Sequence, residues 1–570
     1  MKRGFFHLAL HGHVPYVVNH GTWPHGEVWL QEAAWETYIP LIKTLTECRN
    51  QNHKAKLTLN LSPILLEQLS NPTFIKNLEA YIEDQIRYAR KEEEEYKTKE
   101  PTRSELAKYW VSVLEDRKSF FENINGDIVN AFRKLVEEET IEIISCAATH
   151  GYLPLLGYDE CVEAQIKIGI TTSKKYFNNI EIKGFWLPEC AYRSSYQWTN
   201  PLTGESFFRK GLEMILSDNE VSFSYTDYHL LVGQEKVGTI KSPYETREWK
   251  DSKERRKISE NNEYAQKVLP LKPYYCVSPG YEKGVIFLVR DPIGTARVWS
   301  RDMGFPGNGR YLEFHKRAFP GGHRFWRVTD RKLGLGAKEY YEPQKAIEAI
   351  NEHAEAFVNM LKGRLREATS DTDIPPIFVE VFDAELFGHW WYEGTLWLKE
   401  IFKLMDLNEE IKPIFGREVP KVYEKIEITH LWEGSWGAGG DHRIWFNEET
   451  KWMWKKIYEC EKKMVYELST MEPKSDLHLL ALNQAAKELL LLEASDWEFL
   501  YTTWQARDYA EQRFERHYEF FQKAYTISKL INEGLSLEGR DKDIETLQKI
   551  ATTDNIFTGV EYRFWKPKEQ

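Results

Sequence analysis

The sequence predicts an α/β protein built around a β/α barrel, with an inserted subdomain and a helical C-terminal region. Short apolar runs alternate with longer helical patterns, which is typical of α/β architecture. Several runs end in polar or ionisable residues followed by an aromatic or proline-containing loop, as barrel strands do at the face that carries the chemistry. From about residue 415 onward, long amphipathic helical patterns replace the strands.

Six apolar runs are the expected strands of the barrel, at residues 4–10, 55–61, 141–147, 182–187, 285–289 and 377–382. A long, highly charged segment separates the fourth run from the fifth, and its charge density favours an exposed insertion. We therefore expect four regions: the first part of the catalytic barrel, an inserted subdomain with a mobile loop, the second part of the barrel, and a helical domain contributing to the active-site cleft. Their predicted bounds are 1–195, 196–280, 281–415 and 416–570.

Composition restricts the classes of partner. A chain of 570 residues exceeds what one compact core usually supports, which predicts two or three domains. The net charge of -12, with acids and bases interleaved, gives no basic surface for nucleic acid. No apolar run approaches the roughly 20 residues that span a membrane. The six cysteines are scattered singly, which fits reduced thiols and a cytoplasmic location.

Two acidic residues stand at the ends of predicted strands. Glu189 follows the run IEIKGFWLP, and Pro188 fixes the backbone before it, so its carboxylate should project from the strand end. Asp383 ends the run IFVEVF among aromatic neighbours, whose desolvation would raise its pKa. The alternatives are an ion pair of Glu189 with Arg193, and a solvated loop carboxylate at Asp383. Two carboxylates at separate strand ends are the equipment of glycoside hydrolysis.

Two histidines suggest a rival chemistry. His11 and His13 in HGHVPY lie two residues apart after the first strand and point the same way. Such a pair can bind a metal in a metal-dependent hydrolase, with His150, Asp383 and His389 available as further ligands. Without a metal, the pair could donate hydrogen bonds to sugar hydroxyls, or be satisfied structural histidines.

The segment THLWEGSWGAGGDHRIW places Trp432, Trp436 and Trp445 among four glycines. Glycines allow a ligand to approach the backbone, and aromatic faces can stack on sugar rings. A phosphate-binding loop is the alternative, but the segment lacks both the GK[ST] ending of a P-loop and the GxGxxG spacing of a dinucleotide site. An aromatic sugar platform is the preferred interpretation.

Five motifs in order resemble the conserved regions of glycoside hydrolase family 57: HGHVPY, ATHGYLPLL, WLPECAY, VFDAELFGHWW and EGSWGAGGDHRIW. The resemblance runs from residue 4 to about residue 520. It implies an incomplete (β/α)7 barrel with a helical C-terminal domain, a retaining mechanism on α-glucans, and no metal or other cofactor in catalysis. By motif, Glu189 resembles the family nucleophile and Asp383 its general acid/base.

Within that family, the branching enzymes have further glucan-contacting positions. By motif these correspond to Arg290, Gly307, Trp436 and Asp496. Asp496 could instead serve as the N-cap of its helix, as could Ser495. The remaining residues expected to bind substrate are His11, His13, His150, Trp186, Trp390 and Trp432.

The resemblance favours a 1,4-α-glucan branching enzyme, with an α-glucan as partner and neither nucleic acid nor membrane. An α-amylase or a 4-α-glucanotransferase keeps the same machinery and changes the acceptor, and a catalytically inactive glucan-binding protein is a further alternative. Family branching enzymes shield the intermediate from water with a tyrosine on a flexible loop. Four candidates lie in or beside the charged segment: Tyr244, Tyr264, Tyr274 and Tyr275.

Overall fold

The computed structural model describes residues 3–232, 269–300, 302–368 and 374–568. Seven parallel strands form the wall of a barrel. In spatial order they are β10 (Ile377–Asp383), β1 (Gly4–Gly12), β2 (Leu57–Leu61), β3 (Ile141–Cys146), β4 (Gly184–Trp186), β7 (Phe223–Asp227) and β9 (Gly284–Arg290). Strand residues are almost all buried, as expected of parallel strands covered by helices.

The barrel is open between β9 and β10. No strand ladder joins these two strands within the described residues, and a backbone hydrogen bond from Asp291 N to Val379 O (2.8 Å) crosses the gap. Three short strands extend the sheet: β8 (Tyr274–Val277) pairs antiparallel with β9, β12 (Glu427–Thr429) pairs with β8, and β11 (Ile411–Pro413) pairs with β1. This confirms the incomplete (β/α)7 barrel, and all six predicted strands are present.

The prediction of a separate subdomain at 196–280 is wrong in part. Strand β7 and helix α8 (Leu212–Asp218) fall in this range, and β7 lies between β4 and β9 in the barrel sheet. The strand was missed because its sequence, FSYTD, alternates aromatic with polar residues beside a strongly charged segment. The hairpin of β5 (Tyr196–Thr199) and β6 (Ser206–Arg209) does lie outside the barrel sheet. The predicted mobile loop falls mostly outside the described residues.

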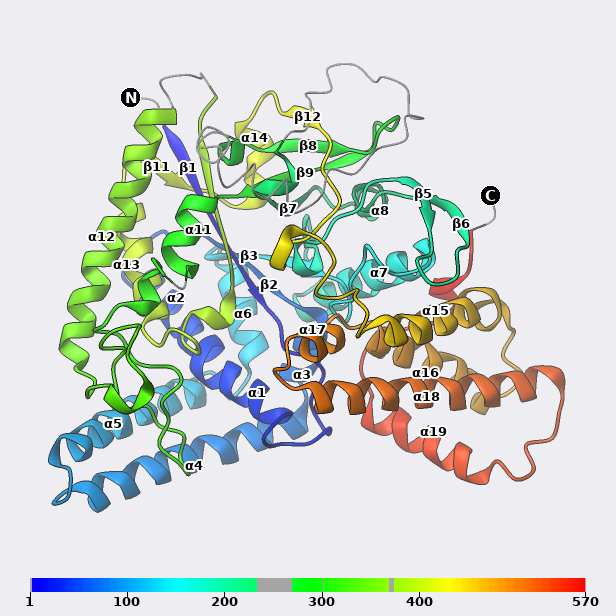
Figure 1. The fold of residues 1–570 in the computed structure, drawn as a ribbon, viewed down its shortest axis with the longest axis horizontal. Coiled ribbons are helices and arrows are strands. Elements are labelled where there is room, and N and C mark those ends of the chain that lie inside the picture. Colours follow the sequence, from blue (N-terminus) through cyan, green and yellow to red (C-terminus); the bar gives the residue numbers. More distant parts are fainter. Residues whose placement is uncertain (1–2, 233–268, 301, 369–373, 569–570) are drawn as a thin grey trace.

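Helices surround the barrel on its outer side (Figure 1). Between β2 and β3 the long helices α4 and α5 form a hairpin that projects from the body of the molecule. The helices up to residue 422 are α1 (Glu27–Ala33), α2 (Ile39–Asn50), α3 (Pro63–Leu69), α4 (Pro72–Tyr96), α5 (Pro101–Asn123), α6 (Ile128–Glu137), α7 (Asp159–Tyr176), α8, α11 (Pro292–Trp299), α12 (Pro343–Ala368), α13 (Gly394–Asp406) and α14 (Val419–Val422).

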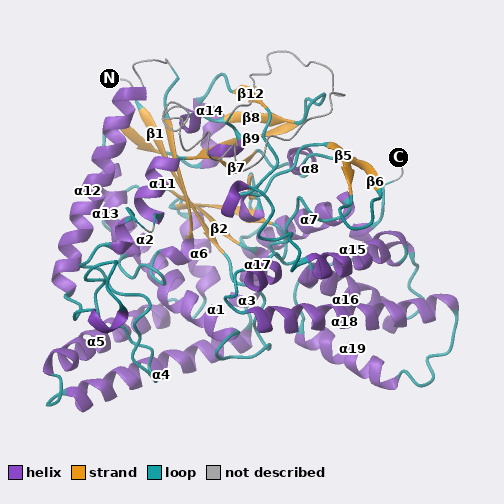
Figure 2. Cartoon of the chain, in the orientation of Figure 1, coloured by secondary structure: helices purple, strands orange, loops and turns teal. Residues whose placement is uncertain are grey.

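The C-terminal region is helical and packs against the barrel (Figure 2). Its helices are α15 (Lys451–Tyr466), α16 (Asp476–Leu492), α17 (Asp496–Thr502), α18 (Arg507–Glu533) and α19 (Asp541–Thr553). An isolated bridge between Gly151 and Ala494 joins the loop after β3 to the turn between α16 and α17. The start of α17 is thereby fixed beside the strand ends. Among the helices described, none has the length and apolarity needed to span a membrane.

Candidate active site

Glu189 directly follows β4 and is held in an unusual backbone conformation. Its φ of 60° and ψ of 21° are left-handed, and the next residue, Cys190, also has a positive φ of 48°. Such conformations are costly for residues other than glycine and cluster at functional sites. Trp436 fixes the residue twice: its backbone N–H donates to Glu189 O (3.0 Å), and its indole Nε1 donates to Glu189 Oε2 (2.6 Å).

Glu189 does not form the ion pair with Arg193 that the sequence offered as an alternative. Arg193 is fully buried and lies 3.7 Å from Asp159, so that interpretation is wrong. The Glu189 side chain keeps 19% of its surface exposed, which leaves it open to a substrate.

Asp383 is the last residue of β10, beside β1. Its Cα is paired in register with that of His11, so it belongs to a strand end and not to a solvated loop. Burial raises the pKa of Asp383 to about 6, against the opposing effect of the charges on Arg290 and His13. Burial also raises the pKa of Glu189 to about 8, and the negative charge of Asp383 adds to that shift. The two carboxyl groups therefore share one electrostatic environment.

Three histidines stack between the two carboxyl groups. The His11 ring lies over Trp186 of β4 (centroids 4.7 Å apart, 6° between planes), and His13 stacks on His150 (4.1 Å). His11 Nε2 contacts His150 Nε2 at 3.0 Å. The side chain of Trp186 is thus covered by a histidine, and the stack connects the end of β1 to the end of β4.

The hydrogen bonds of the stack define its protonation. Asn60 Oδ1 accepts from His11 Nδ1 (2.7 Å), so His11 Nε2 accepts from His150 Nε2, and His150 Nδ1 accepts from the Ser495 hydroxyl (2.8 Å). Burial lowers the pKa of His11 to about 3 and that of His150 well below its usual value. Both of these imidazoles are therefore neutral.

His13 is the charged member of the stack. Its Nε2 lies 3.1 Å from each carboxylate oxygen of Asp496, and its Nδ1 lies 2.8 Å from Ser62 Oγ. Burial alone would lower the pKa of His13, but the Asp496 carboxylate, together with the charges of Glu385 and Glu189, raises it. The imidazolium in turn lowers the pKa of both Glu189 and Asp383.

The same contacts bear on two sequence-based alternatives. All six ring nitrogens of His11, His13 and His150 have protein partners, which favours the interpretation of the histidines as a hydrogen-bonded network. His389 is engaged elsewhere, with Glu36 (2.5 Å). The N-cap interpretation of Asp496 and Ser495 is wrong, because neither side chain caps α17 and both bond to histidines.

Arg290 lies at the end of β9 and reaches the same site. Its Nη1 donates to Asp227 Oδ2 (2.8 Å), and its guanidinium lies 5.5 Å from the centroid of the Trp436 ring. Asp227 was not among the residues proposed from sequence. Its signal was present, since it is an ionisable residue at the end of a strand, but β7 itself was missed.

Glu385 and Tyr38 were also missed as members of the site. Glu385 Oε1 accepts from the backbone N–H of His13 (3.1 Å) and from the hydroxyl of Tyr38, and burial raises the pKa of Glu385 to about 7. Tyr38 ends a π-helical turn, Ala34–Tyr38, a rare element that often marks functional sites. The two residues fix the backbone of His13.

Three further residues expected to bind substrate have contacts of their own. Trp432 donates a hydrogen bond from Nε1 to Val232 O (3.0 Å). The carbonyl of Gly307 accepts from Arg331 Nε (2.8 Å). Trp390 is 39% exposed and meets Trp299 edge-on at 5.9 Å.

The aromatic platform predicted from the glycine-rich segment is only partly present. Trp436 is at the site, but it acts there through its indole N–H and its edge-on contact with Trp186 (5.2 Å). Trp445 is 1% exposed and stacks on Tyr152 (4.4 Å), so it is core and not a sugar-binding surface.

The shielding-tyrosine candidates divide into two pairs. Tyr244 and Tyr264 lie outside the described residues. Tyr274 and Tyr275 belong to β8, between β9 and β12, and the Tyr275 hydroxyl accepts from Gly284 N (3.0 Å). Residues fixed in a sheet are poorly suited to a moving shield.

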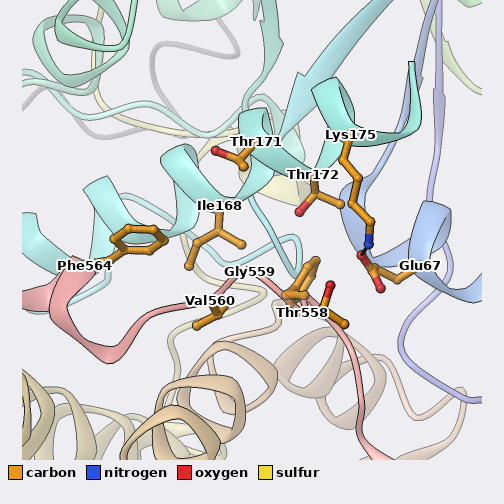
Figure 3. A pocket seen from close by; sticks show the side chains of 10 residues that line it. Glu67, Ile168, Thr171, Thr172, Lys175, Thr558, Gly559, Val560 and Phe564 are labelled. Atoms are coloured by element: carbon orange, nitrogen blue, oxygen red, sulfur yellow. Dashed lines mark hydrogen bonds and ion pairs between the residues drawn. The ribbon is translucent and has the colours of Figure 1, made fainter. Parts of the chain in front are cut away.

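A small cavity lies between α3, α7 and the C-terminal segment near Phe564 (Figure 3). Its volume is about 60 Å³, and the Glu67–Lys175 ion pair (3.1 Å) lies at one end. On this measure one water molecule needs roughly 10 to 15 Å³, so the space can hold a few water molecules.

A barrel whose strand ends hold two partly buried carboxyl groups among aromatic rings has the equipment of an enzyme that cleaves glycosidic bonds. The chain belongs to glycosyl hydrolase family 57, whose family model matches residues 7–425. The model of the C-terminal region of 1,4-alpha-glucan branching enzymes matches residues 456–565. The chain is therefore a family 57 enzyme, as the five motifs predicted, and its C-terminal region is that of branching enzymes.

Known relatives cover almost the whole chain. A 1,4-alpha-glucan branching enzyme of Thermococcus kodakarensis is 36% identical over 561 residues, which are 98% of this chain and 78% of that protein. The crystal structure of a family 57 branching enzyme from Pyrococcus horikoshii aligns with a TM-score of 0.87 and 34% identity, covering 99% and 97% of the two chains. The alpha-amylase AmyC of Thermotoga maritima aligns with a TM-score of 0.80 and 29% identity over all of both chains.

Proposed function

We propose that the chain is a 1,4-α-glucan branching enzyme, which cleaves α-1,4 linkages with retention and transfers the released chain to a 6-hydroxyl. The main support for the proposal is that the C-terminal region contributes side chains to the site at the strand ends of the barrel. The turn that begins α17 supplies Ser495 and Asp496, which bond to His150 and His13 between the two carboxyl groups. The segment that matches branching enzymes thus completes the site, and we propose that it forms one side of the cleft.

In this proposal Glu189 is the nucleophile and Asp383 is the general acid/base. The Glu189 carboxylate attacks the anomeric carbon while Asp383 protonates the departing glycosidic oxygen, which gives a covalent glycosyl-enzyme and a free chain end. Asp383 then takes the proton of an acceptor 6-hydroxyl, whose oxygen displaces Glu189 from the anomeric carbon. Atoms and charge balance over the two steps.

Neighbouring residues support these roles. The left-handed backbone and the Trp436 indole hold Glu189 in one orientation, which supports a reaction that requires alignment with the anomeric carbon. The His13 imidazolium, held by Asp496, is placed to stabilise whichever carboxyl group is ionised. In the sugar-free protein the higher pKa of Glu189 favours the proton there, and catalysis uses the form in which it lies on Asp383.

The pKa values of the pair predict a bell-shaped dependence of kcat/KM on pH. Below about 6 both groups are protonated and no nucleophile is present, and above about 8 both are ionised and no acid is present. We expect a maximum near pH 7. The apparent pKa of each limb describes the two coupled carboxyl groups together and not one residue alone. Initial rates on amylose in constant-ionic-strength buffers from pH 4 to pH 10 measure the profile, and a single limb would contradict the shared-proton account.

Replacing Arg290 by Gln is expected to move the acidic limb of this profile to higher pH by about one unit, because a positive charge that lowers the pKa of Asp383 is removed. The release of Asp227 from its partner should lower kcat/KM as well. Arg310→Gln is the matched control, since Arg310 pairs with Glu352 on the exposed side of α12. An unshifted limb in Arg290→Gln would contradict the electrostatic role.

An α-amylase is the second candidate, supported by the similarity to AmyC over the whole chain. The two functions share the first half-reaction and differ in whether a 6-hydroxyl or water accepts the glycosyl group. Proton NMR of amylose after incubation separates them. We expect new α-1,6 anomeric signals that grow faster than reducing ends, and accumulation of reducing ends alone would overturn the branching function.

We also propose a cytoplasmic location and an α-glucan as substrate. All six cysteines are buried and unpaired, which suits a reducing compartment. If the protein is unfolded and alkylated directly on isolation, before any reductant is added, mass spectrometry should find six alkylated cysteines.

A further inference from the structure

Trp504 combines two unfavourable features at the surface. Its backbone is left-handed, with a φ of 58°, a conformation that is rare for a bulky residue. Its side chain is 69% exposed and takes no part in the hydrophobic core. Neither feature stabilises the fold, because glycine would adopt this backbone freely and a polar residue would suit the exposure. A role in binding would account for both.

The ring of Trp504 contacts a cation on one side. The guanidinium of Arg507 lies 4.2 Å from the Trp504 ring centroid and 3.9 Å from that of Tyr501. Arg507 Nη1 also donates to Glu449 Oε2 at 2.7 Å. The indole therefore packs against the Arg507 guanidinium, with most of its surface open to solvent and with charged groups beside it.

Trp504 lies at the far end of the helix that begins in the active site. Helix α17 starts at Asp496, which bonds to His13, and its 7 residues span roughly 10 Å. The first turn of α18, which follows Trp504, lies beside the loop between β1 and α1, since the hydroxyl of Tyr509 donates to His20 O at 3.5 Å. A polymeric substrate that fills the site and leaves it along α17 would pass this ring.

We propose that Trp504 and Arg507 form a subsite that binds one glucose unit of a glucan chain outside the catalytic centre. The apolar C–H face of the sugar would stack on the indole, while its hydroxyls reach Arg507 and Glu449. This inference rests on the proposed function, which supplies the glucan. A second protein copy is the less suitable occupant, because polar residues flank the ring in the sequence TTWQ and a stable interface needs a larger apolar centre.

Binding measured in a Glu189→Gln parent tests the subsite without consuming the ligand. Trp504→Gly in this parent is expected to weaken the binding of long amylose about tenfold, because the apolar face of the sugar then stays in water, while maltotriose binding changes less than about twofold. Trp504→Phe, which keeps a ring, should recover most of the affinity. Isothermal titration calorimetry gives each Kd.

Two controls separate binding from folding. The Tm of Trp504→Gly should equal or exceed that of the parent, because glycine relieves the positive φ. Tyr466→Ala removes another exposed ring, on α15, and should leave the Kd for amylose unchanged.

Each other outcome overturns a defined claim. Equal amylose affinity of the parent and Trp504→Gly overturns the subsite alone, as does equal weakening for amylose and maltotriose. A changed oligomeric mass with unchanged amylose affinity would instead make the ring an interface between copies. A parent that binds neither amylose nor maltotriose overturns the proposed function, and the subsite with it.

Discussion

Replacement of Glu189 by Gln is expected to lower kcat on amylose by roughly 10⁴-fold or more, because it removes the group that forms the covalent intermediate. The amide keeps the size of the side chain and can still accept the hydrogen bond from the Trp436 indole. Glucan binding should therefore change little. Branching and hydrolysis should fall together, since both start from the same intermediate, and rates by iodine staining and reducing-end release check this.

A matched control is a buried glutamate outside the site. Glu213 is fully buried, accepts from Tyr192 and Ser278, and has its pKa raised by burial. It lies outside the site, and the hydroxyls of Tyr192 and Ser278 can still bond to an amide, so Glu213→Gln should keep kcat within a few fold. Wild-type turnover in Glu189→Gln would remove this residue from the mechanism, and an equal loss in Glu213→Gln would point to a general effect on folding.

Asp383→Asn is expected to lower kcat on amylose by roughly 10³-fold, because the departing glycosidic oxygen loses its proton donor. A glycosyl fluoride needs little protonation to depart, so α-maltosyl fluoride should still form the glycosyl-enzyme in this variant. Added azide needs no general base and should attack that intermediate. The rate should rise with azide, and NMR should identify an α-glycosyl azide.

The configuration of the azide product distinguishes the two carboxyl groups. In Asp383→Asn, azide displaces Glu189 and the product has the α configuration of the substrate. In a small Glu189 variant such as Glu189→Gly, azide occupies the place of the nucleophile and attacks the sugar directly, so the product has the β configuration. Exchanged configurations would exchange the roles proposed for the two residues.

The sequence predicted the barrel because parallel strands buried on both sides are continuous apolar runs, and the six runs of this kind are all strands. Strand β7 was missed because Ser224 and Thr226 interrupt its apolar pattern. Its position follows only from pairing with β4 and β9, which is a contact between distant segments. Asp227 was lost with it.

The two carboxyl residues could be proposed from local pattern alone, because each ends an apolar run. The geometry around them could not. Asp496 bonds to His13 across 483 positions of sequence, and the indole of Trp436 reaches Glu189 across 247. No local pattern encodes such contacts, which depend on the packing of the C-terminal region against the barrel.

Local pattern also gave the wrong role to some residues it identified. Trp445 shares its glycine-rich segment with Trp436, yet it is core, because burial depends on what packs against each ring. The histidines suited a metal by spacing, and the structure shows their nitrogens bonded to Asn60, Ser62 and Ser495 as well as Asp496. The sequence spacing of the histidines shows that they could bind a metal together. Their hydrogen bonds, which the spacing does not reveal, show which ring nitrogens already have protein partners.

The most direct test of the mechanism is to identify the residue that becomes glycosylated. A 5-fluoro-α-glycosyl fluoride reacts with a retaining enzyme and slows the breakdown of the intermediate, so the adduct can be located by peptide mass spectrometry. The account predicts a single adduct on Glu189, in the peptide that contains FWLPECAY. In Asp383→Asn, any adduct should also lie on Glu189 and on no other residue. An adduct on Asp383 or another side chain of the wild-type protein would contradict it.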